Sequence, residues 1–438
     1  IDLGVTARHE AAILDLASNQ FLAKHLRFHS LPEELDTLLE RSRKKANEPC
    51  EVIAILEATS MAWYPVSLYL ARQGVKVYRV NGRQTQALRG VYAPHARSDR
   101  IDGQVLARLW QTASDQLIPL WVPTAQQMQL QRLCREFVRW RDQAVAVQNR
   151  LTAYDHWAWA NLATVVPSEA LAWVRRSWYD PWRVTQAGTT QLSSAWQQTA
   201  PAKQADASWI VGWVARAQQM VKLFAVPEAV DFPTLEQTIQ RNLDLLTTCE
   251  QAMQSLTSQI QPLFAQLYPD SPLPTIYGIG TESAAIYMAF IGSIDRFSSV
   301  ASFRQWCGIV PASSQSGQTQ SKVLHLTKAG IDPIKATLYL NANVARQWDL
   351  QLAKLYYTQM VDFGKHHHQA VCAVASHLAS RIYAVLKQNR PFELRNLDGK
   401  PISSLDSRQQ ILDHFQVPEQ VRQRTNVHSR RHTLADLP

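Results

Sequence analysis

The first part of the chain, residues 1 to about 120, is constrained by a fixed order of short apolar runs. Three runs separated by turn-length gaps predict an antiparallel meander of strands: Ile1–Thr6, His9–Leu16 and Phe21–Phe28. Helical and strand periods then alternate, as a helix at Pro32–Lys45, a strand at Val52–Leu56, a helix at Trp63–Gln73, a strand at Val75–Val80 and a helix at Asp99–Ala113. This order predicts an α/β domain.

The element order is typical of the ribonuclease-H-like type of α/β domain, and four carboxylates stand at strand ends and on the last helix. Asp2 lies in the first strand, and Glu57 follows an apolar run and therefore projects from a strand tip. Asp99 and Asp102 open the helix three residues apart, on one face. Helix capping is the ordinary explanation for such acids, because they complement the helix dipole. In the predicted sheet, however, all four carboxylates converge, and converging carboxylates repel unless cations neutralise them. The residues therefore predict a site for Mg²⁺ or Mn²⁺, and two such ions about 4 Å apart promote phosphodiester cleavage.

From Leu130 onward the apolar pattern changes to heptads. Two runs step by alternating three and four residues: Leu130, Leu133, Phe137, Trp140, Ala144, Val147 and Leu151, then Leu246, Cys249, Met253, Leu256, Ile260, Leu263 and Leu267. They predict an antiparallel coiled-coil hairpin or a dimerisation surface, with burial against a globular domain as the alternative. Arg135 and Arg139 lie off the apolar seam, where we expect them to contact a nucleic-acid backbone or to pack protomers together.

The segment of about 155–230, between the heptad runs, is rich in tryptophan. It holds eight of the fourteen tryptophans: Trp157, Trp159, Trp173, Trp178, Trp182, Trp196, Trp209 and Trp213. Arg175, Arg176 and Arg183 are interleaved with them. Exposed Trp beside Arg would form a stacking platform for unpaired bases, whereas the alternative is a small helical subdomain with an aromatic core.

A second, mainly helical region is expected from about residue 271 to about 390, followed by a loosely packed basic extension. Gly278 and Gly280 form a turn before the apolar helix Ala284–Ile291. Such glycines allow close backbone approach, either to a phosphate or at a tight helix entry. Consecutive residues on a helix point in different directions, so we assign no metal to His366–His368. At the end of the extension, Arg422, Arg424, Arg430 and Arg431 lie in a run without an acid, which suits either a phosphate contact or a solvated tail.

Composition narrows the class of partner. The formal net charge of +9 favours a polyanion, because Lys and Arg that neutralise phosphates release counterions. The five cysteines include no CxxC pair and predict neither a zinc site nor a disulfide framework. The most apolar stretch, Ile276–Ile294, is interpreted as a loop and a buried helix rather than a membrane span, so an intracellular, non-membrane protein is expected. The abrupt start at Ile1 and Asp2 suggests that a few residues precede them.

Three blocks carry a resemblance to a known family. They are Ile1-Asp2-Leu3-Gly4, Leu56-Glu57-Ala58-Thr59 and Ser98-Asp99-Arg100-Ile101-Asp102-Gly103. They look like the DEDD signature of the "one-ten" insertion-sequence transposases, a family that includes the Piv pilin-gene invertase. Its N-terminal domain is similar to the Holliday-junction resolvase RuvC. The second region follows the family's order with Tyr277–Gly280, Phe297, Cys307–Pro311, Ser316-Gly317, Thr327–Gly330, Gly364-Lys365 and the helix Ala370–Lys387. The resemblance covers about 1–150 and 240–390.

The resemblance implies that the serine before the glycine, Ser316, is the recombinase nucleophile. Residue types alone leave three neighbouring rivals: Ser313, Ser314 and Ser321. A serine hydroxyl needs activation, and Lys322, His325 and Lys328 are near enough in sequence to supply positive charge. The chain departs from the usual pattern at residues 318–320, where Gln-Thr-Gln replaces a second glycine and basic residues.

The expected organisation is a RuvC-like DEDD domain at 1–122, a coiled-coil hairpin with the Trp-rich insert at 123–270, a helical transposase domain at 271–390 and a basic extension at 391–438. The resemblance implies a Mg²⁺-dependent recombinase of the bacterial cytosol and nucleoid that acts on double-stranded donor and target DNA. It also implies a structured bridge RNA as guide, a 5′-phosphoserine link, and a dimer or tetramer in which the carboxylates of one protomer meet the serine of another. A Piv-like invertase without guide RNA and a resolvase-type nuclease are the alternatives. A non-enzymatic scaffold is disfavoured because it would not place four acids near phosphates.

Overall fold

The computed structural model describes residues 1–43, 50–57, 61–80, 98–199, 206–309 and 330–422, together with 82, 85, 86, 89, 92, 315, 316, 319 and 320. At residues 99, 116, 315, 316, 319 and 320 it describes the backbone alone. The chain divides into two compact units. The first comprises Ile1–Gln131 with Phe264–Pro438, and the second comprises Arg132–Leu263.

The N-terminal part of the first unit contains one small sheet. Its strands are β1 (His9–Asp15), β2 (Gln20–Phe28), β3 (Ile53–Glu57) and β4 (Lys76–Val80). β1 pairs antiparallel with β2, and β3 pairs parallel with β4. Asp2 joins the two pairs, because it bridges antiparallel to Glu10 of β1 and parallel to Glu57 of β3. The order across the sheet is therefore β4, β3, the Asp2 segment, β1 and β2.

The first expected strand, Ile1–Thr6, is reduced to the single bridge at Asp2. The chain turns immediately afterwards, since a Cβ atom on Gly4 would lie 2.6 Å from the Ala7 carbonyl oxygen. Val5 is 74% exposed, so it does not continue the alternation of a half-buried strand. The prediction was wrong here because apolar residue types alone did not reveal this turn.

Helices cover both faces of the sheet. They are α1 (Pro32–Arg43), α2 (Trp63–Arg72) and α4 (Asp99–Ala113). Leu56 of β3 packs with α1 and α2, whereas its neighbour Ile55 packs with Leu106 and Leu109 of α4. Alternate residues of a strand face opposite sides, so each strand contributes to two cores. The predicted limits of these elements agree with the structure to within about two residues.

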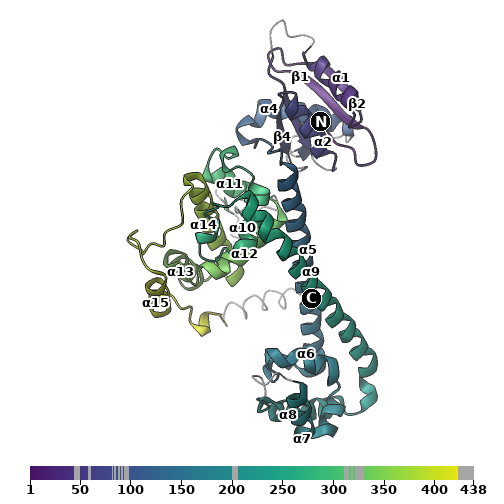
Figure 1. Cartoon of the computed structure of the whole chain (residues 1–438), viewed down its shortest axis with the longest axis vertical. Coiled ribbons are helices and arrows are strands. Elements are labelled where there is room, and N and C mark those ends of the chain that lie inside the picture. The colour runs from purple at the N-terminus through teal and green to yellow at the C-terminus, as the bar shows by residue number, and fades with distance from the viewer. Residues whose placement is uncertain are drawn as a thin grey trace. The chain divides into compact units, whose positions relative to one another are not determined.

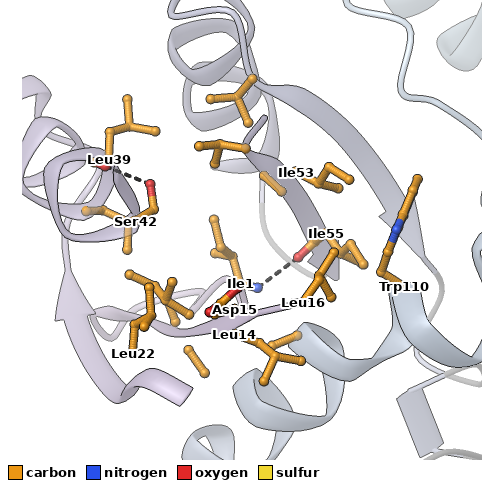
Figure 2. Close-up of a pocket in the computed structure, with 18 of the residues that line it drawn as sticks. Ile1, Leu14, Asp15, Leu16, Leu22, Leu39, Ser42, Ile53, Ile55 and Trp110 are labelled. Carbon is orange, nitrogen blue, oxygen red and sulfur yellow. Dashed lines mark hydrogen bonds between the residues drawn. The ribbon is translucent and has the colours of Figure 1, made fainter. Parts of the chain in front are cut away.

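A cavity of about 290 Å³ lies between β1, β3, α1 and α4 (Figure 2). Its lining is mostly aliphatic, with Leu14, Leu39 and Ile53 among the side chains that face it. Beside it, the Ile1 nitrogen donates to the Ile55 carbonyl oxygen at 2.8 Å, which extends the ladder between the Asp2 segment and β3. The acids of the predicted metal site are not part of this lining.

The described residues of the second unit form helices joined by short loops. Its elements are α5 (Ala125–Trp159), which begins in the first unit, α6 (Ser168–Ser177), α7 (Pro181–Thr199), α8 (Trp209–Phe224) and α9 (Phe232–Leu267), which ends in the first unit. α5 leads into the group formed by α6, α7 and α8, and α9 leads out of it in the opposite direction (Figure 1). Val147 and Leu151 of α5 share a core with Ile239 and Leu243 of α9, which precede the predicted second heptad run; Leu246, the first residue of that run, packs against the same core.

The tryptophan-rich segment forms the core of this unit. Trp159 and Trp213 are fully buried, and their ring centroids are 6.1 Å apart. The interleaved arginines bind carboxylates, in the pairs Arg175–Asp155, Arg176–Asp244 and Arg183–Glu236. The alternative of a helical subdomain with an aromatic core is therefore the one observed, and a stacking platform is wrong for these buried rings. Trp157 differs, since it is 58% exposed.

The C-terminal part of the first unit is a group of helices. They are α10 (Thr281–Ile291), α11 (Val300–Cys307), α12 (Asp332–Ala345), α13 (Leu350–Tyr357), α14 (His367–Gln388) and α15 (Ser404–His414), with a π-helical turn at Thr358–Asp362. α14 contacts α11, α12 and α13. Among the described helices it alone is long and apolar enough to span a membrane, and half of its apolar stretch is buried inside the protein. The expected loose extension is in part ordered, because Ile411 of α15 packs against Leu350 and Ala353 of α13.

Candidate active site

The sheet brings three acidic residues into one row. Asp2 and Glu10 exchange both backbone hydrogen bonds, at 2.8 and 2.9 Å, and Asp2 also pairs with Glu57. Paired residues on adjacent strands project from the same face. Their chain neighbours Leu3 and Leu56 belong to the core beneath α1 and α2. The three acids therefore face the other side, which α4 covers.

Glu10 is the member of this row that the sequence analysis missed. It is 5% exposed, and its carboxylate binds Arg27 Nε at 2.6 Å and His25 Nε2 at 2.7 Å. The available signal was an acid inside an apolar strand, a position that requires a partner when buried. Because β2 supplies both partners, Glu10 acts as an ion-pairing residue within the β1–β2 hairpin.

Glu57 ends β3 opposite Val80, as expected for an acid at a strand tip. Gly82 lies beside its carboxylate. A Cβ atom on Gly82 would be 2.9 Å from Glu57 Oε1, closer than side-chain contacts allow. The Gly82 backbone therefore lies close to this oxygen, which is the movable end of the Glu57 side chain.

Asp102 lies in the first turn of α4, which Ser98 caps by accepting from the Ile101 N–H. The helix packs directly on β1, since a Cβ atom on Gly103 would lie 3.6 Å from the Ala11 carbonyl carbon. Asp102 is 8% exposed, and both carboxylate oxygens accept from Arg89, at 2.5 Å from Nε and 2.5 Å from the second nitrogen. A buried carboxylate held by a bidentate guanidinium does more than cap a helix, and the sequence contained no sign of Arg89 as its partner.

The structure thus places Asp2, Glu57 and Asp102 around one face of the sheet. Asp99 belongs to the same first turn of α4, and its side chain lies outside the described residues. Within the described part of the chain, no group of three or more His, Cys, Asp or Glu side chains is close enough to hold a metal ion. Among the described acids of the predicted site, Asp2 and Glu57 are paired on adjacent strands, whereas Asp102 is bound by Arg89.

Ser316 lies in a two-stranded hairpin. β5 (Gln315–Ser316) pairs antiparallel with β6 (Thr319–Gln320), and Ser316 stands opposite Thr319. Its side chain is outside the described residues, as are Lys322, Lys328 and the rival serines.

The residues predicted to contact nucleic acid lie in different environments: the glycines lie at or near packed helices, and the arginines lie at exposed positions. Gly278 has φ +89°, and its carbonyl oxygen accepts from the buried Asn341 side chain of α12 at 2.6 Å. A Cβ atom there would be 2.7 Å from the Ala345 nitrogen, so close helix packing is sufficient to require glycine. Gly280 is the residue before α10. Arg135 and Arg139 are on exposed positions of α5, where Arg139 pairs with Glu136.

Two transposase family models match the chain, one in its N-terminal part and one in its C-terminal part. Residues 1–154 match a family model for the DEDD transposase of IS110, described as "Transposase". Residues 270–358 match a second model, described as "Transposase IS116/IS110/IS902 family". The chain belongs to the IS110 family of transposases. Members of this family cut DNA and transfer strands, so the chain is an enzyme of DNA recombination.

The chain is also similar to an insertion-element protein and to two pilin gene-inverting proteins. The chain is 23% identical over 419 residues to the uncharacterized 43.6 kDa protein of insertion element IS110 from Streptomyces coelicolor, which covers 92% of this chain and 97% of that protein. It is 28% identical over 128 residues to the pilin gene-inverting protein of Moraxella lacunata, 29% of this chain and 40% of that protein. The corresponding protein of Moraxella bovis is 28% identical over 125 residues, 28% of this chain and 39% of its own length. This IS110-family chain thus matches one insertion-element protein over nearly its full length.

Proposed function

We propose that the chain is the recombinase of an insertion sequence, in which Asp2, Glu57, Asp99 and Asp102 hold Mg²⁺ or Mn²⁺ and Ser316 forms a covalent link to DNA. The observation that supports this most is the meeting of Asp2, Glu57 and α4 on one face of the sheet, in a chain whose family cuts and rejoins DNA. The strand order β4, β3, Asp2 segment, β1 and β2, with α4 over the acids, also favours a RuvC-like domain.

The residues suit a hard divalent cation. Carboxylate oxygens are the ligands that Mg²⁺ prefers, and Asp2 and Glu57 are paired on adjacent strands. Arg89 bonds both oxygens of the Asp102 carboxylate, so an ion bound by Asp102 would take the place of this guanidinium at one oxygen or both. When bound, the ion would offset the charge of a phosphate and stabilise the oxygen that leaves it.

The chemical step itself belongs to the serine. Ser316 Oγ attacks a phosphorus atom of the DNA backbone, the bond from phosphorus to the 3′ oxygen breaks, and a 5′-phosphoserine link forms. The hydroxyl proton of Ser316 leaves as the bond forms, and the departing 3′ oxygen gains a proton. In strand exchange, a 3′ hydroxyl of the other DNA attacks the phosphoserine and releases Ser316. The covalent link retains the energy of the broken phosphodiester, so rejoining needs no ATP.

Three further features rest on the family resemblance. They are a structured guide RNA that pairs with donor and target DNA, a dimer or tetramer with a site shared between protomers, and residence in the bacterial cytosol. The match to the pilin gene-inverting proteins favours a second candidate, an invertase that uses the same two catalytic parts without guide RNA. A resolvase-type nuclease would use water in place of Ser316. Nucleic acid that copurifies with the chain distinguishes the first two, because only the first carries RNA of a single sequence.

The carboxylate half of the proposal is tested with Asp102→Asn and Arg89→Gln. DNA cleavage in Mg²⁺ and unfolding in urea are measured for each variant. If Asp102 holds the ion, Asp102→Asn abolishes cleavage and leaves nucleic-acid binding in EDTA nearly unchanged, while Arg89→Gln retains cleavage to the extent that it remains folded. If the two residues form only a structural ion pair, both variants lose stability and cleavage in parallel, because each leaves one buried charge without its partner.

A further inference from the structure

The three consecutive histidines at the start of α14 each engage a different partner. His366 Nδ1 accepts from the His368 backbone N–H at 3.3 Å. His367 Nδ1 lies 2.8 Å from the Tyr356 hydroxyl, and His368 Nδ1 lies 2.6 Å from the Tyr339 hydroxyl. Among the described residues, the hydrogen bonds of these rings run through Nδ1, so Nε2 is the ring atom that would contact a ligand. The rings remain close, with centroids 5.1 Å apart for His366 and His368.

Arg346, at the end of α12, adds a half-buried positive charge to this group. Its guanidinium lies 4.0 Å from the centroid of the Tyr356 ring, and its Nε donates to Asn343 Oδ1 at 2.9 Å. Burial lowers the pKa of Arg346, and Arg422 acts in the same direction. Burial also lowers the pKa of His367, followed by the charges of Arg346, the two neighbouring histidines and Arg422.

The charges at this cluster are of one sign. The electrostatic neighbours resolved for Arg346 and His367 are tyrosines and other cations, with no carboxylate among them in the described part of the chain. Of the basic residues on α12 and α14, Lys335 pairs with Asp332 at 2.7 Å and Lys387 with Asp295 at 2.5 Å. Asp349 is bound to Arg381 at 3.0 Å, and Asp362 is exposed. A half-buried guanidinium with no carboxylate among its described neighbours favours an anionic ligand.

We propose that Arg346, His367 and His368 form a binding site for the phosphodiester groups of a nucleic-acid backbone. A guanidinium donates two parallel hydrogen bonds to phosphate oxygens, and an imidazole whose Nδ1 accepts from a tyrosine hydroxyl adds its Nε2–H as a further donor. The site shares no residue with the carboxylate positions or with Ser316. It rests on the nucleic-acid binding of the proposed function and on no part of the cleavage mechanism.

The test measures binding of the full chain to a DNA duplex and to an RNA duplex of the same sequence, in EDTA, at several salt concentrations. Arg346→Gln should weaken binding about tenfold and reduce the slope of log K against log salt by about one phosphate contact. Arg346→Lys should retain most of the slope. Lys354→Gln is the matched control, because it removes the same charge from an exposed position on α13 and should leave the slope unchanged.

The two duplexes identify the source of the phosphate: an effect with DNA alone, RNA alone or both supports the site and names its ligand. Equal slopes for Arg346→Gln and the wild type would overturn the proposal, as would equal losses for Arg346→Gln and Lys354→Gln. Because Arg346 also packs on Tyr356, the exposed His368→Gln provides a second variant that preserves this packing, and it should weaken binding with an unchanged unfolding midpoint. Unaltered binding by His368→Gln would count against the site. The measurement in EDTA is independent of strand cleavage, so its failure leaves the cleavage proposal untouched.

Discussion

Replacing Gly278 with Ala should destabilise the C-terminal helices. The loss should exceed the cost of placing alanine at a positive φ angle, because the new Cβ atom would also collide with α12. Gly278 has φ +89°, and the added Cβ would lie 2.7 Å from both the Ala345 nitrogen and the Asn341 carbonyl oxygen. Both atoms belong to the backbone of α12, which cannot move aside as a flexible side chain does. Asn341 also donates to the Gly278 carbonyl, so a displaced backbone would weaken this buried hydrogen bond.

Gly364→Ala supplies the reference for the size of this effect. Gly364 has φ +60°, and an added Cβ there would meet nothing within 4 Å. The left-handed conformation costs a non-glycine residue about 1–2 kcal/mol, which is the whole expected effect at Gly364. Overpacking adds about 1–3 kcal/mol, so Gly278→Ala should cost about 2–5 kcal/mol in total.

Hydrogen exchange of the α10 and α12 amides measures the opening free energy of this region in each variant. Nucleic-acid binding is measured in parallel, under conditions where both variants remain folded. A loss of protection in α10 and α12 for Gly278→Ala, well beyond that for Gly364→Ala, would support the packing argument. Equal protection in the two variants, together with weaker binding by Gly278→Ala alone, would refute it and assign Gly278 to a phosphate contact.

Two more predictions concern buried rings. Trp213→Ala should cost the second unit about 3–5 kcal/mol, seen as a lower urea midpoint for its helices, whereas Trp157→Ala, at an exposed position, should leave the midpoint nearly unchanged. His9 is 6% exposed and bonds Ser30 through Nε2 at 2.9 Å, and burial lowers its pKa. The contribution of neutral His9 to stability is therefore present above pH 6.5 and is lost as the pH falls toward the pKa of the folded state. The free energy of unfolding should fall by about 1.4 kcal/mol per unit of pKa shift, and urea midpoints at pH 7.5 and 5.5 measure this loss. His9→Asn should reduce the difference between the two midpoints. An equal pH dependence in the variant and the wild type would contradict the assignment.

Residue patterns predicted the elements of the N-terminal sheet because each strand and helix has its own apolar period. The helix Asp99–Ala113 has the predicted limits, since Ser98 supplies the side-chain cap that starts it. The pattern failed where a backbone contact decides the outcome, as at Gly4, whose approach to Ala7 ends the first strand after the Asp2 bridge. Periodicity contains no information about such a turn.

The candidate site was predictable in position and less so in its electrostatics. The strand order places Asp2 and Glu57 side by side, and sequence alternation indicates which face they share. Arg89 was not predictable, because its pairing with Asp102 depends on tertiary structure rather than on spacing. The tryptophan-rich segment shows the same limit. Arginines interleaved with tryptophans suit either an exposed stacking platform or a buried core. The structure decides between these alternatives because the three arginines pair with Asp155, Asp244 and Glu236.

The central claim is that a serine of this chain attacks DNA, and the most direct measurement is the covalent adduct. The protein is incubated with Mg²⁺ and end-labelled DNA, denatured, and examined for label that migrates with the polypeptide. The account predicts an adduct that Ser316→Ala abolishes and that Ser313→Ala, Ser314→Ala and Ser321→Ala retain. Cleavage by Ser316→Ala at the wild-type rate, without any adduct, would contradict the account and favour hydrolysis by water at the carboxylate site.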